Sequence, residues 1–246
     1  MKISILQWNI LFTEKHENIL KLVREIQPDV ACFQEFTYKN EFYNPTTDLS
    51  EAMRGWDYEE FAVVTRRDTN KAGLFQGDAI FSRLPIVKRR AVNVRDGDLD
   101  ATDFSKEIRS YLKIVACANG KNLTVGTTHL SYSPRFEQND DKISEAKNLL
   151  SEIEGNRENF ILTGDFNSLP NSFLVRELSK KLQNAAPDFR EPTWTTKPFD
   201  YQDFQADALD WRLDYVFATR DVKVAKSEII ATDFSDHLPI LTTIEI

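Results

Sequence analysis

The first 34 residues contain the pattern that most restricts the fold of this chain. An apolar run at residues 3–8 predicts a buried strand, and residues 13–27 carry apolar side chains at helical spacing. Pro28 ends the predicted helix, and residues 30–34 form a second apolar run that closes on a glutamate. A strand, a helix and a strand in this order place both strands in one sheet, so the sequence predicts an α/β protein.

The middle of the chain follows a different pattern. Residues 57–66, 77–82, 86–94 and 108–116 are short runs rich in Val, Ile, Phe and Tyr, which predict strands without intervening helices. Asn119 and Gly120 then separate two such runs, and this dipeptide is the strongest short signal for a β-hairpin. Crossovers and hairpins together predict mixed sheets.

Helical spacing returns in the second half of the chain. Residues 140–154 and 171–182 are predicted helices, and the first has Ile143, Ala146, Leu150 and Ile153 on one face. Further strands are predicted at 160–163, 213–218, 222–230 and 238–246, with an irregular segment at 187–209. Because no composition break or linker divides the chain, residues 1–246 are predicted to form one domain.

Composition excludes several classes of protein. A net charge of −8 over 246 residues argues against a broad basic face for non-specific nucleic-acid binding, although a local basic groove is compatible with it. Cys32 and Cys117 lie in separate apolar runs, which predicts two buried free thiols in a reducing compartment and therefore a cytoplasmic protein. The N-terminal segment lacks a cleavage site, and no segment is apolar enough for membrane insertion.

Polar side chains recur where the predicted strands begin or end. In α/β proteins, ligands bind at strand ends, where loops rise from a rigid sheet. The chain places acids, amides and histidines there: Asn9, Glu35, His129, Asp165, Asn167, Asp214, Asp236 and His237. Asp165 and Asn167 are two residues apart, so an extended backbone would point both side chains the same way.

The chemistry of this set indicates phosphoester hydrolysis. Carboxylate and amide oxygens suit Mg²⁺ or Mn²⁺, and zinc fits less well because the chain has no paired-cysteine or HExxH pattern. Histidines beside acids exchange protons near neutral pH. Taken singly, each residue also has an ordinary structural interpretation as a turn, a cap or, for Asp214, a salt bridge with Arg212.

The order of these residues is more informative than any one of them. The series Trp8-Asn9, Gln34-Glu35, Thr128-His129-Leu130, Gly164-Asp165-Phe166-Asn167, Arg212-Leu213-Asp214-Tyr215 and Ser235-Asp236-His237 resembles the motifs of the endonuclease/exonuclease/phosphatase superfamily, which has the deoxyribonuclease-I-like fold. The segment Gly77-Asp78-Ala79-Ile80-Phe81-Ser82 also resembles a central strand of that family. The matches extend over nearly the whole chain.

The resemblance implies a fold and a role for each motif residue. The fold is a four-layer α/β sandwich, in which two mixed, mainly antiparallel sheets lie face to face with helices outside. The implied metal ligands are Asn9, Glu35 and Asp236. The implied catalytic residues are His129, Asp165, Asn167, Asp214 and His237. Asp165 would activate water, Asn167 would donate to the phosphate, and Asp214 would orient a histidine that the sequence does not identify.

Arg109 is a further candidate for contact with the phosphate. It precedes the hairpin that leads to His129, where family members place a base, but a surface arginine on an edge strand is an equally good interpretation. The chain has Thr-His-Leu-Ser-Tyr where the apurinic endonuclease branch has a tyrosine and a Pro-Asn element. The histidine pattern is instead shared by deoxyribonucleases, tyrosyl-DNA phosphodiesterases, deadenylases and sphingomyelinases.

The expected activity is Mg²⁺- or Mn²⁺-dependent hydrolysis of a phosphoester, in DNA or RNA or at a nucleic-acid end, by a monomer without a protein partner. The aromatic residues Trp194, Phe199, Tyr201, Phe204 and Trp211 could stack on bases or pack a loop onto the core. The alternative substrate is a small phosphoester, such as a lipid headgroup, an inositol phosphate or a nucleotide derivative. A non-enzymatic binding module is disfavoured because every motif residue is present.

Overall fold

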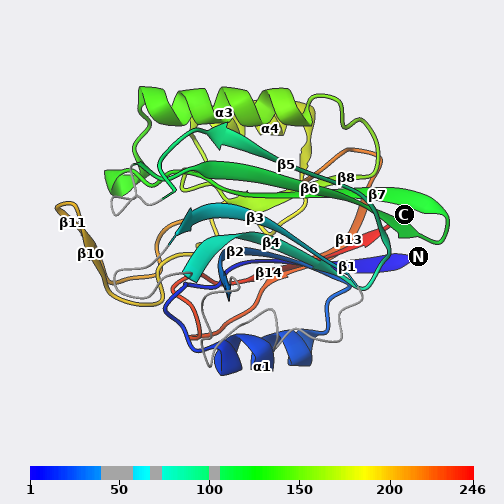
Figure 1. Ribbon diagram of the computed structural model, residues 1–246, viewed down its shortest axis with the longest axis horizontal. Helices are drawn as coiled ribbons and strands as arrows, with labels where there is room; N and C mark the ends of the chain where they lie inside the picture. Colours follow the sequence, from blue (N-terminus) through cyan, green and yellow to red (C-terminus); the bar gives the residue numbers. More distant parts are fainter. Residues whose placement is uncertain (40–57, 67–73, 100–105) are drawn as a thin grey trace.

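The computed structural model describes residues 1–39, 58–66, 74–99 and 106–246, which form a four-layer sandwich (Figure 1). Two β-sheets face each other, helix α1 covers the outer face of one sheet, and helices α3 and α4 cover the outer face of the other. Each sheet contains parallel and antiparallel neighbours. The predicted fold class is therefore confirmed.

The first sheet has the strand order β13-β14-β1-β2-β4-β3. Its strands are Lys223–Ile229, Ile240–Glu245, Lys2–Asn9, Val30–Lys39, Leu74–Ser82 and Tyr58–Arg66 in that order. Strands β1 and β2 are parallel, as the β-α-β pattern predicts, and α1 (His16–Ile26) connects them. The helix ends at Gln27, whose left-handed φ of 49° terminates the helical turn immediately before Pro28.

The second sheet has the strand order β5-β6-β7-β8-β12-β9. Its strands are Ile86–Arg95, Arg109–Ala118, Lys121–His129, Phe160–Asp165, Asp214–Ala218 and Gln183–Asn184. Asn119 and Gly120 form the predicted turn between β6 and β7, with φ values of 50° and 80°. The parallel pair β7 and β8 is connected through the short helix η2 (Pro134–Phe136) and α3 (Asp140–Ile153), and α4 (Phe173–Lys181) follows β8.

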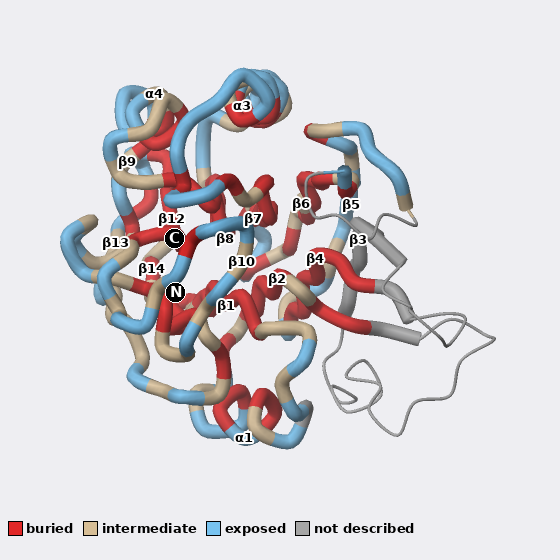
Figure 2. The backbone as a smooth tube through the Cα atoms, turned by 90° about the vertical axis from the view of Figure 1, so that its left-hand side faces the viewer, coloured by how far each residue is buried: buried red, intermediate tan, exposed pale blue. Residues whose placement is uncertain are grey.

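Apolar residues fill all three interfaces between the layers. Ile5, Ile80 and Ile114 are among those buried between the sheets, where Figure 2 shows buried backbone on both facing surfaces. Separate clusters pack α1 against the first sheet and α3 and α4 against the second. Cys32 is a buried free thiol as predicted, but Cys117 is only half-buried, because alternate residues of β6 face away from the central core.

Two segments differ from their predictions. The segment predicted to be irregular contains a hairpin of β10 (Phe199–Tyr201) and β11 (Phe204–Ala206), which projects from the sandwich in Figure 1. Its turn residues Gln202 and Asp203 have φ values of 50° and 59° without the Asn-Gly signature, so the sequence signal is weak.

Helix α3 is the second difference, because its buried face is rotated from the predicted one. The buried residues are Lys142, Glu145, Ala146, Leu149 and Ile153. Two charged side chains thus occupy positions toward the interior. No helix in the described part of the chain is long and apolar enough to cross a membrane.

Candidate active site

The register of the second sheet places three of the candidate residues side by side on neighbouring strands. His129 at the end of β7 is paired with Asp165 at the end of β8, and Asp165 is also paired with Asp214 at the start of β12. Gly164 permits this arrangement: its φ is 155°, and a Cβ atom there would lie 2.2 Å from the carbonyl oxygen of Thr128. Only a glycine therefore allows the two backbone segments to approach this closely.

The first sheet contributes the residues of the opposite half. Asn9 at the end of β1 is paired with Gln34 on β2. Glu35 follows in a β-bulge against β4 and has a left-handed φ of 58°. The expectation that the second strand ends at Glu35 is wrong, because β2 continues to Lys39. The bulge re-aims the Glu35 side chain within a continuing strand.

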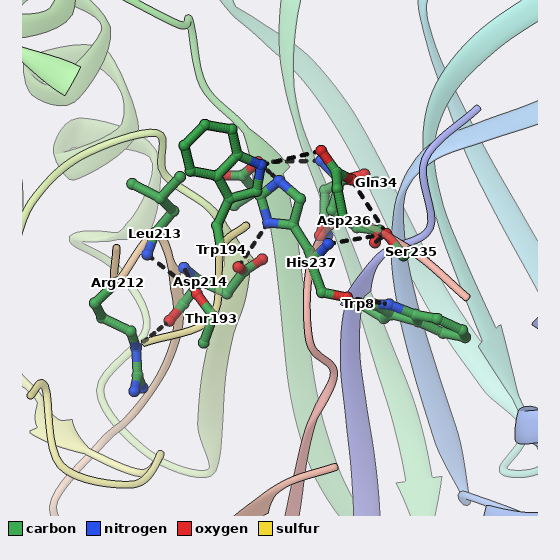
Figure 3. Close-up of polar contacts among 12 residues, drawn as sticks. Trp8, Gln34, Thr193, Trp194, Arg212, Leu213, Asp214, Ser235, Asp236 and His237 are labelled. Atoms are coloured by element: carbon green, nitrogen blue, oxygen red, sulfur yellow. Dashed lines mark hydrogen bonds and ion pairs between the residues drawn. The ribbon is translucent and has the colours of Figure 1, made fainter. Parts of the chain in front are cut away.

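The segment before β14 is fastened to the end of β1. Ser235 Oγ donates to the carbonyl oxygen of Asn9 at 2.7 Å, and the backbone N–H of His237 donates to Ser235 Oγ at 3.1 Å. Trp8 Nε1 donates to the carbonyl oxygen of His237 at 2.9 Å. These bonds hold Asp236 and His237 beside residues that lie more than 220 positions earlier in the chain, as Figure 3 shows for Trp8, Ser235 and His237.

His237 is the histidine that is hydrogen-bonded to Asp214. The Nδ1 atom of His237 lies 2.8 Å from Asp214 Oδ2, and Figure 3 shows the two side chains directed toward each other. Thr193 Oγ1 accepts from the Asp214 N–H at 3.2 Å. Arg212 donates through Nε to the backbone carbonyl of Asp214 at 2.7 Å. The Asp214 carboxylate is therefore directed to the imidazole, and the simple salt bridge with Arg212 is not formed.

Burial and charge oppose each other at His237. Burial lowers the pKa of the imidazole, but the carboxylates of Asp214 and Asp165 outweigh this effect and raise the net pKa to about 10. His237 Nε2 lies 3.6 Å from Asp165 Oδ2. Burial also raises the pKa of Asp165, although the charge of His237 opposes this. The pKa values of both members of this closely spaced pair are therefore raised.

The loop after β8 folds back instead of continuing as an extended strand. Asn167 has a left-handed φ of 46°, and its backbone N–H donates to Asp165 Oδ1 at 2.8 Å. The expectation of parallel side chains on an extended segment is therefore wrong. Asn167 Nδ2 donates to the carbonyl oxygen of Leu130 at 2.9 Å and lies 3.1 Å from His129 Nε2. That histidine atom is 3.4 Å from Asp165 Oδ2.

Glu35, Asn9 and Asp236 form a carboxylate-rich group next to these residues. Asn9 Nδ2 donates to Glu35 Oε1 at 3.2 Å and to Asp165 Oδ2 at 3.1 Å, and so connects the two halves of the site. Trp194 Nε1 donates to Asp236 Oδ2 at 3.0 Å. Burial raises the pKa of Glu35, and the charge of Asp236 raises it further.

A cavity of ≈ 100 Å³ opens onto this set of residues. Six of the predicted residues line it: Glu35, His129, Asp165, Asn167, Asp236 and His237. Arg109 lines it too, is 3% exposed, and lies 3.0 Å from Glu107 through Nη2. The alternative of a surface arginine on an edge strand is wrong, because β6 is an interior strand. Asn9 and Asp214 contact lining residues from behind.

Aromatic side chains form one wall of the cavity. Phe136, Trp194, Phe199, Tyr201 and Tyr132 line it. Trp194 and Phe204 are buried, and Trp211 packs against Phe136 with ring centroids 5.2 Å apart. The packing interpretation therefore holds for these three, whereas Phe199 and Tyr201 remain half-buried on the hairpin.

The other basic residues considered do not form one track along this cavity. Lys88 and Arg89 are exposed on β5, and Arg90 is bonded to Glu152 at 3.0 Å. Arg135 lies beside the β10–β11 hairpin. Arg67 lies outside the described residues, as does the side chain of Arg66. Of the basic residues considered, Arg109 is the one that lines the cavity.

Two groups of side chains have the chemistry of metal ligands. Ligand atoms of Asp165, Asp214 and His237 lie within 4.8 Å of one another, but the hydrogen bond between Asp214 and His237 already uses two of them. The half-buried carboxylates of Glu35 and Asp236 oppose each other electrostatically, and the charge of His237 offsets this only in part, because the pKa of Glu35 remains raised. Their oxygen donors fit a hard divalent cation better.

The contacts of three supporting residues with the site were not identified from the sequence. Thr193 and Trp194 lie in a polar and aromatic loop without periodicity, and they contact Asp214 and Asp236. Ser235 was noted only as part of a motif, yet its hydroxyl anchors the segment to Asn9. The only sequence signal at Thr193 and Trp194 is the short Pro192-Thr193-Trp194 stretch in a polar segment, and it does not specify a partner.

Comparison with known proteins identifies a family and several relatives of this chain. The family model described as Endonuclease/Exonuclease/phosphatase family matches residues 6–237. The mouse protein named Protein angel homolog 2 is 27% identical over 180 residues, which are 68% of this chain and 30% of that protein. The bovine protein of the same name is 28% identical over an equal span. The chain thus spans about 30% of the length of these relatives.

Solved structures share the fold at low sequence identity. An endonuclease/exonuclease/phosphatase from Beutenbergia cavernae superposes with a TM-score of 0.73 at 21% identity, over 100% of this chain and 72% of that one. TDP2 from D. rerio, in complex with a single-strand DNA product, has a TM-score of 0.71 at 16% identity, over 100% and 99%. A mannosyl-6-phosphatase from Bacteroides thetaiotaomicron has a TM-score of 0.69 at 16% identity, over 99% and 100%.

Proposed function

The chain belongs to the endonuclease/exonuclease/phosphatase family, and on this premise we propose that it is a divalent-metal-dependent phosphodiesterase that acts on nucleic acid. The observation that carries the proposal is the continuous series Asp214, His237 and Asp165 beside the carboxylates of Glu35 and Asp236. Phosphoester hydrolysis needs charge neutralisation, an activated water and a proton donor, and this set offers all of them.

The metal is proposed to be Mg²⁺ or Mn²⁺, held by Glu35 and Asp236 with the amide oxygen of Asn9 as the third donor. The two carboxylates raise the electrostatic cost of their common site, which a divalent cation would relieve. When bound there, the cation supplies positive charge that neutralises phosphate oxygens. Trp194 holds one oxygen of Asp236 and thereby limits the orientation of that carboxylate.

The protein side chains are proposed to move the protons. Asp165 accepts a proton from the attacking water, because burial raises the pKa of this carboxylate and makes it a better base. Asp214 fixes the Nδ1 side of His237, so that Nε2 faces Asp165 and the cavity. The charged imidazole then stabilises the phosphate and supplies a proton.

Asn167 and His129 are proposed to act together on the other side of the phosphate. One amide hydrogen of Asn167 is bonded to the Leu130 carbonyl, which leaves the second for His129 Nε2 or for a phosphate oxygen. Arg109, buried at the cavity wall, is proposed to contact the substrate phosphate.

The aromatic wall supports a nucleic-acid substrate. Tyr132, Phe199 and Tyr201 line the cavity next to the catalytic residues, and nucleic-acid bases stack on such side chains. TDP2, which has the same fold, was solved with a single-strand DNA product. A single strand or an end also fits a narrow cavity better than a duplex does.

A small phosphoester is the second candidate substrate. The cavity of ≈ 100 Å³ favours a compact group, and one protein of the same fold is a mannosyl-6-phosphatase. The proposed catalytic residues would be unchanged, because only the aromatic and basic walls contact the part of the substrate beyond the phosphate.

The test is a substrate panel assayed after treatment with EDTA, with and without added Mg²⁺ or Mn²⁺. The panel contains single-stranded RNA, single-stranded DNA, duplex DNA, sugar phosphates and bis-p-nitrophenyl phosphate. We expect metal-dependent cleavage of a single strand. Asp165→Asn is expected to abolish it, whereas Asp207→Asn, at an exposed acid, leaves it unchanged. Cleavage of bis-p-nitrophenyl phosphate and a sugar phosphate without cleavage of any strand would favour the second candidate.

A further inference from the structure

Helix α3 directs two charged side chains toward the protein interior. Lys142 and Glu145 are 7% and 1% exposed, whereas Lys147 on the same helix is exposed. Charged side chains are rarely buried unless they are paired and hydrogen-bonded, because removing them from water is costly. None of the steps proposed above uses either residue, so their burial needs another explanation.

Lys142 joins the two loops that carry His129 and Asp165. Its Nζ donates to the carbonyl oxygen of Asn167 and to Ser133 Oγ, the second at 3.2 Å. Ser133 Oγ in turn donates to the carbonyl oxygen of Glu137 at 2.6 Å. One ammonium group therefore connects the loop after β7 to the loop after β8.

The contact with Asn167 falls where the backbone is constrained. Asn167 has left-handed φ, its N–H is bonded to Asp165, and its side chain reaches His129 and Leu130. The Lys142 bond uses the backbone carbonyl of the same residue. The position and the orientation of the Asn167 amide thus depend on the ammonium group of Lys142, which α3 supplies.

Glu145 holds the first of these loops from the next turn of α3. It accepts from the backbone N–H of Ser131 at 3.0 Å and from the hydroxyl of the same serine. Arg95 at the end of β5 donates to Ser131 Oγ at 2.8 Å and lies 3.5 Å from Glu145 Oε1. Glu145 therefore fixes the loop after β7 through Ser131. The ammonium group of Lys142 forms a hydrogen bond with the carbonyl oxygen of Asn167 instead.

Lys142 does not line the active-site cavity; it lies at a separate, smaller cavity beside Ser168 and Phe173. A direct contact with the phosphate is therefore excluded by its position. The charged groups that face it are Glu145 on α3, Asp165 on β8 and Arg109 on β6. Burial lowers the pKa of Lys142 to about 8 although both carboxylates raise it, which leaves the side chain charged at neutral pH.

We propose that Lys142 is a positioning residue for hydrolysis: it holds the Asn167 carbonyl and thereby directs the Asn167 amide toward His129 and the phosphate. The proposal rests on the proposed phosphoester hydrolysis for its kinetic test. Its structural part, that Lys142 orders the loop at 165–168, is testable without activity.

The kinetic test compares Lys142→Met with Lys147→Met, a matched change at an exposed lysine of the same helix. Methionine retains the length of the side chain and removes the donor. We expect kcat to fall about 10- to 100-fold with KM little changed, as for other residues that orient a catalytic group. Lys147→Met should retain the wild-type kcat and KM.

A second control separates positioning from general destabilisation. Leu149→Ala removes buried apolar atoms from the same helix but none of the hydrogen bonds that α3 makes to the two loops. It should lower the melting temperature at least as much as Lys142→Met and leave kcat unchanged at a temperature where both variants are folded. Equal loss of kcat in Leu149→Ala and Lys142→Met would show that α3 acts only through stability, and would overturn the proposal.

Amide hydrogen exchange supplies the measurement that does not depend on activity. Lys142→Met should lose protection at residues 165–168, while the exchange of strand β12 stays as in the wild type. If Lys142→Met does not fold, Lys142→Gln, which retains an N–H donor, replaces it and should lose less protection and less kcat than a donor-free Lys142→Leu variant. Unchanged protection and kcat in the folded variant would overturn the inference, whereas an inactive wild type with the expected loss of protection would refute only the proposed function.

Discussion

The two halves of the candidate active site differ in how deeply their carboxylates are buried. On the second sheet, Asp165 and Asp214 are 1% and 0% exposed and are bonded to defined partners in the backbone and in His237. On the first sheet, Glu35 and Asp236 are half-buried and face the cavity. Both halves consist of acids near strand ends that accept hydrogen bonds, but the acids of one half are fully buried and those of the other are partly exposed to the cavity.

This difference separates two tasks that the same type of side chain can perform. A buried carboxylate with fixed hydrogen-bond partners can orient an imidazole or bind a proton, because its pKa is set by burial and by neighbouring charges. A half-buried carboxylate that faces a cavity retains lone pairs for a cation and its water ligands. We therefore expect substitutions in the first group to reduce proton transfer and those in the second to reduce metal affinity.

The largest effect is expected for His237→Ala. The substitution removes the group that connects Asp214 to Asp165, so kcat should fall on the order of 10⁴-fold, the upper range for loss of an acid–base group. Single-turnover hydrolysis of the best substrate of the panel measures it, with circular dichroism to confirm folding. A variant that retains more than a tenth of the wild-type kcat would remove His237 from the proposed chemistry.

Asp214→Asn tests the orienting half alone. The amide keeps the shape of the side chain but removes the charge that fixes the imidazole, so we expect roughly a 10³-fold loss of kcat. The pKa of His237, followed by NMR titration, should fall toward its ordinary value because a carboxylate that raises it is gone. An unchanged titration would mean that Asp165 alone sets the charge of the imidazole.

Glu35→Gln tests the open half. Loss of a ligand charge should raise the Mg²⁺ concentration needed for half-maximal activity about 10- to 100-fold. Added Mg²⁺ should raise the melting temperature of the wild type, since a ligand of the folded state stabilises it, and should raise that of Glu35→Gln much less. Glu137→Gln, at an exposed glutamate, is the matched control. Equal metal stabilisation of both variants would place the cation elsewhere.

The smallest effect is expected on stability, at Asp78 beneath the site. This aspartate of β4 is 1% exposed, and burial raises its pKa to about 7 although Ser110 and Arg109 lower it. Between the ordinary pKa of an unfolded aspartate and pH 7, only the unfolded state releases the proton. The free energy of unfolding therefore falls as pH rises, by up to about 1.4 kcal/mol per pH unit.

Asp78→Asn removes this ionisation. Urea unfolding at several pH values should show that the variant gains stability relative to the wild type from pH 4 to pH 7, and that the difference then stays constant. Parallel profiles for the two proteins would show that Asp78 ionises normally in the folded state.

Much of the fold follows from local patterns that a single sequence displays. The β-α-β start, the Asn119-Gly120 hairpin and the apolar strands predict mixed sheets, and the sheets are mixed. The order of polar motifs likewise indicates the residues that line the cavity. Two predictions about local backbone conformation failed. The strand predicted to end at Glu35 continues through a bulge, and the segment predicted to be extended at Asn167 turns back.

Helix α3 shows why such failures occur. Its apolar residues alone predict a face that includes Ile143 and Leu150, but the structure turns Lys142 and Glu145 inward. Periodicity counts only apolar burial, whereas the free energy also includes the hydrogen bonds that these charges form with Asn167 and Ser131. The loops that supply those partners come from other parts of the chain.

The sequence by itself determined the types of elements, their order and the side chains available for chemistry, because these depend on neighbours within a few positions. Only the tertiary structure decided that Asp214 orients His237, that Arg109 is buried at the cavity, and that a lysine of α3 reaches Asn167. The physical reason is distance along the chain. Contacts such as that between Trp8 and His237 span 229 positions, and sheet register rather than local propensity brings them together.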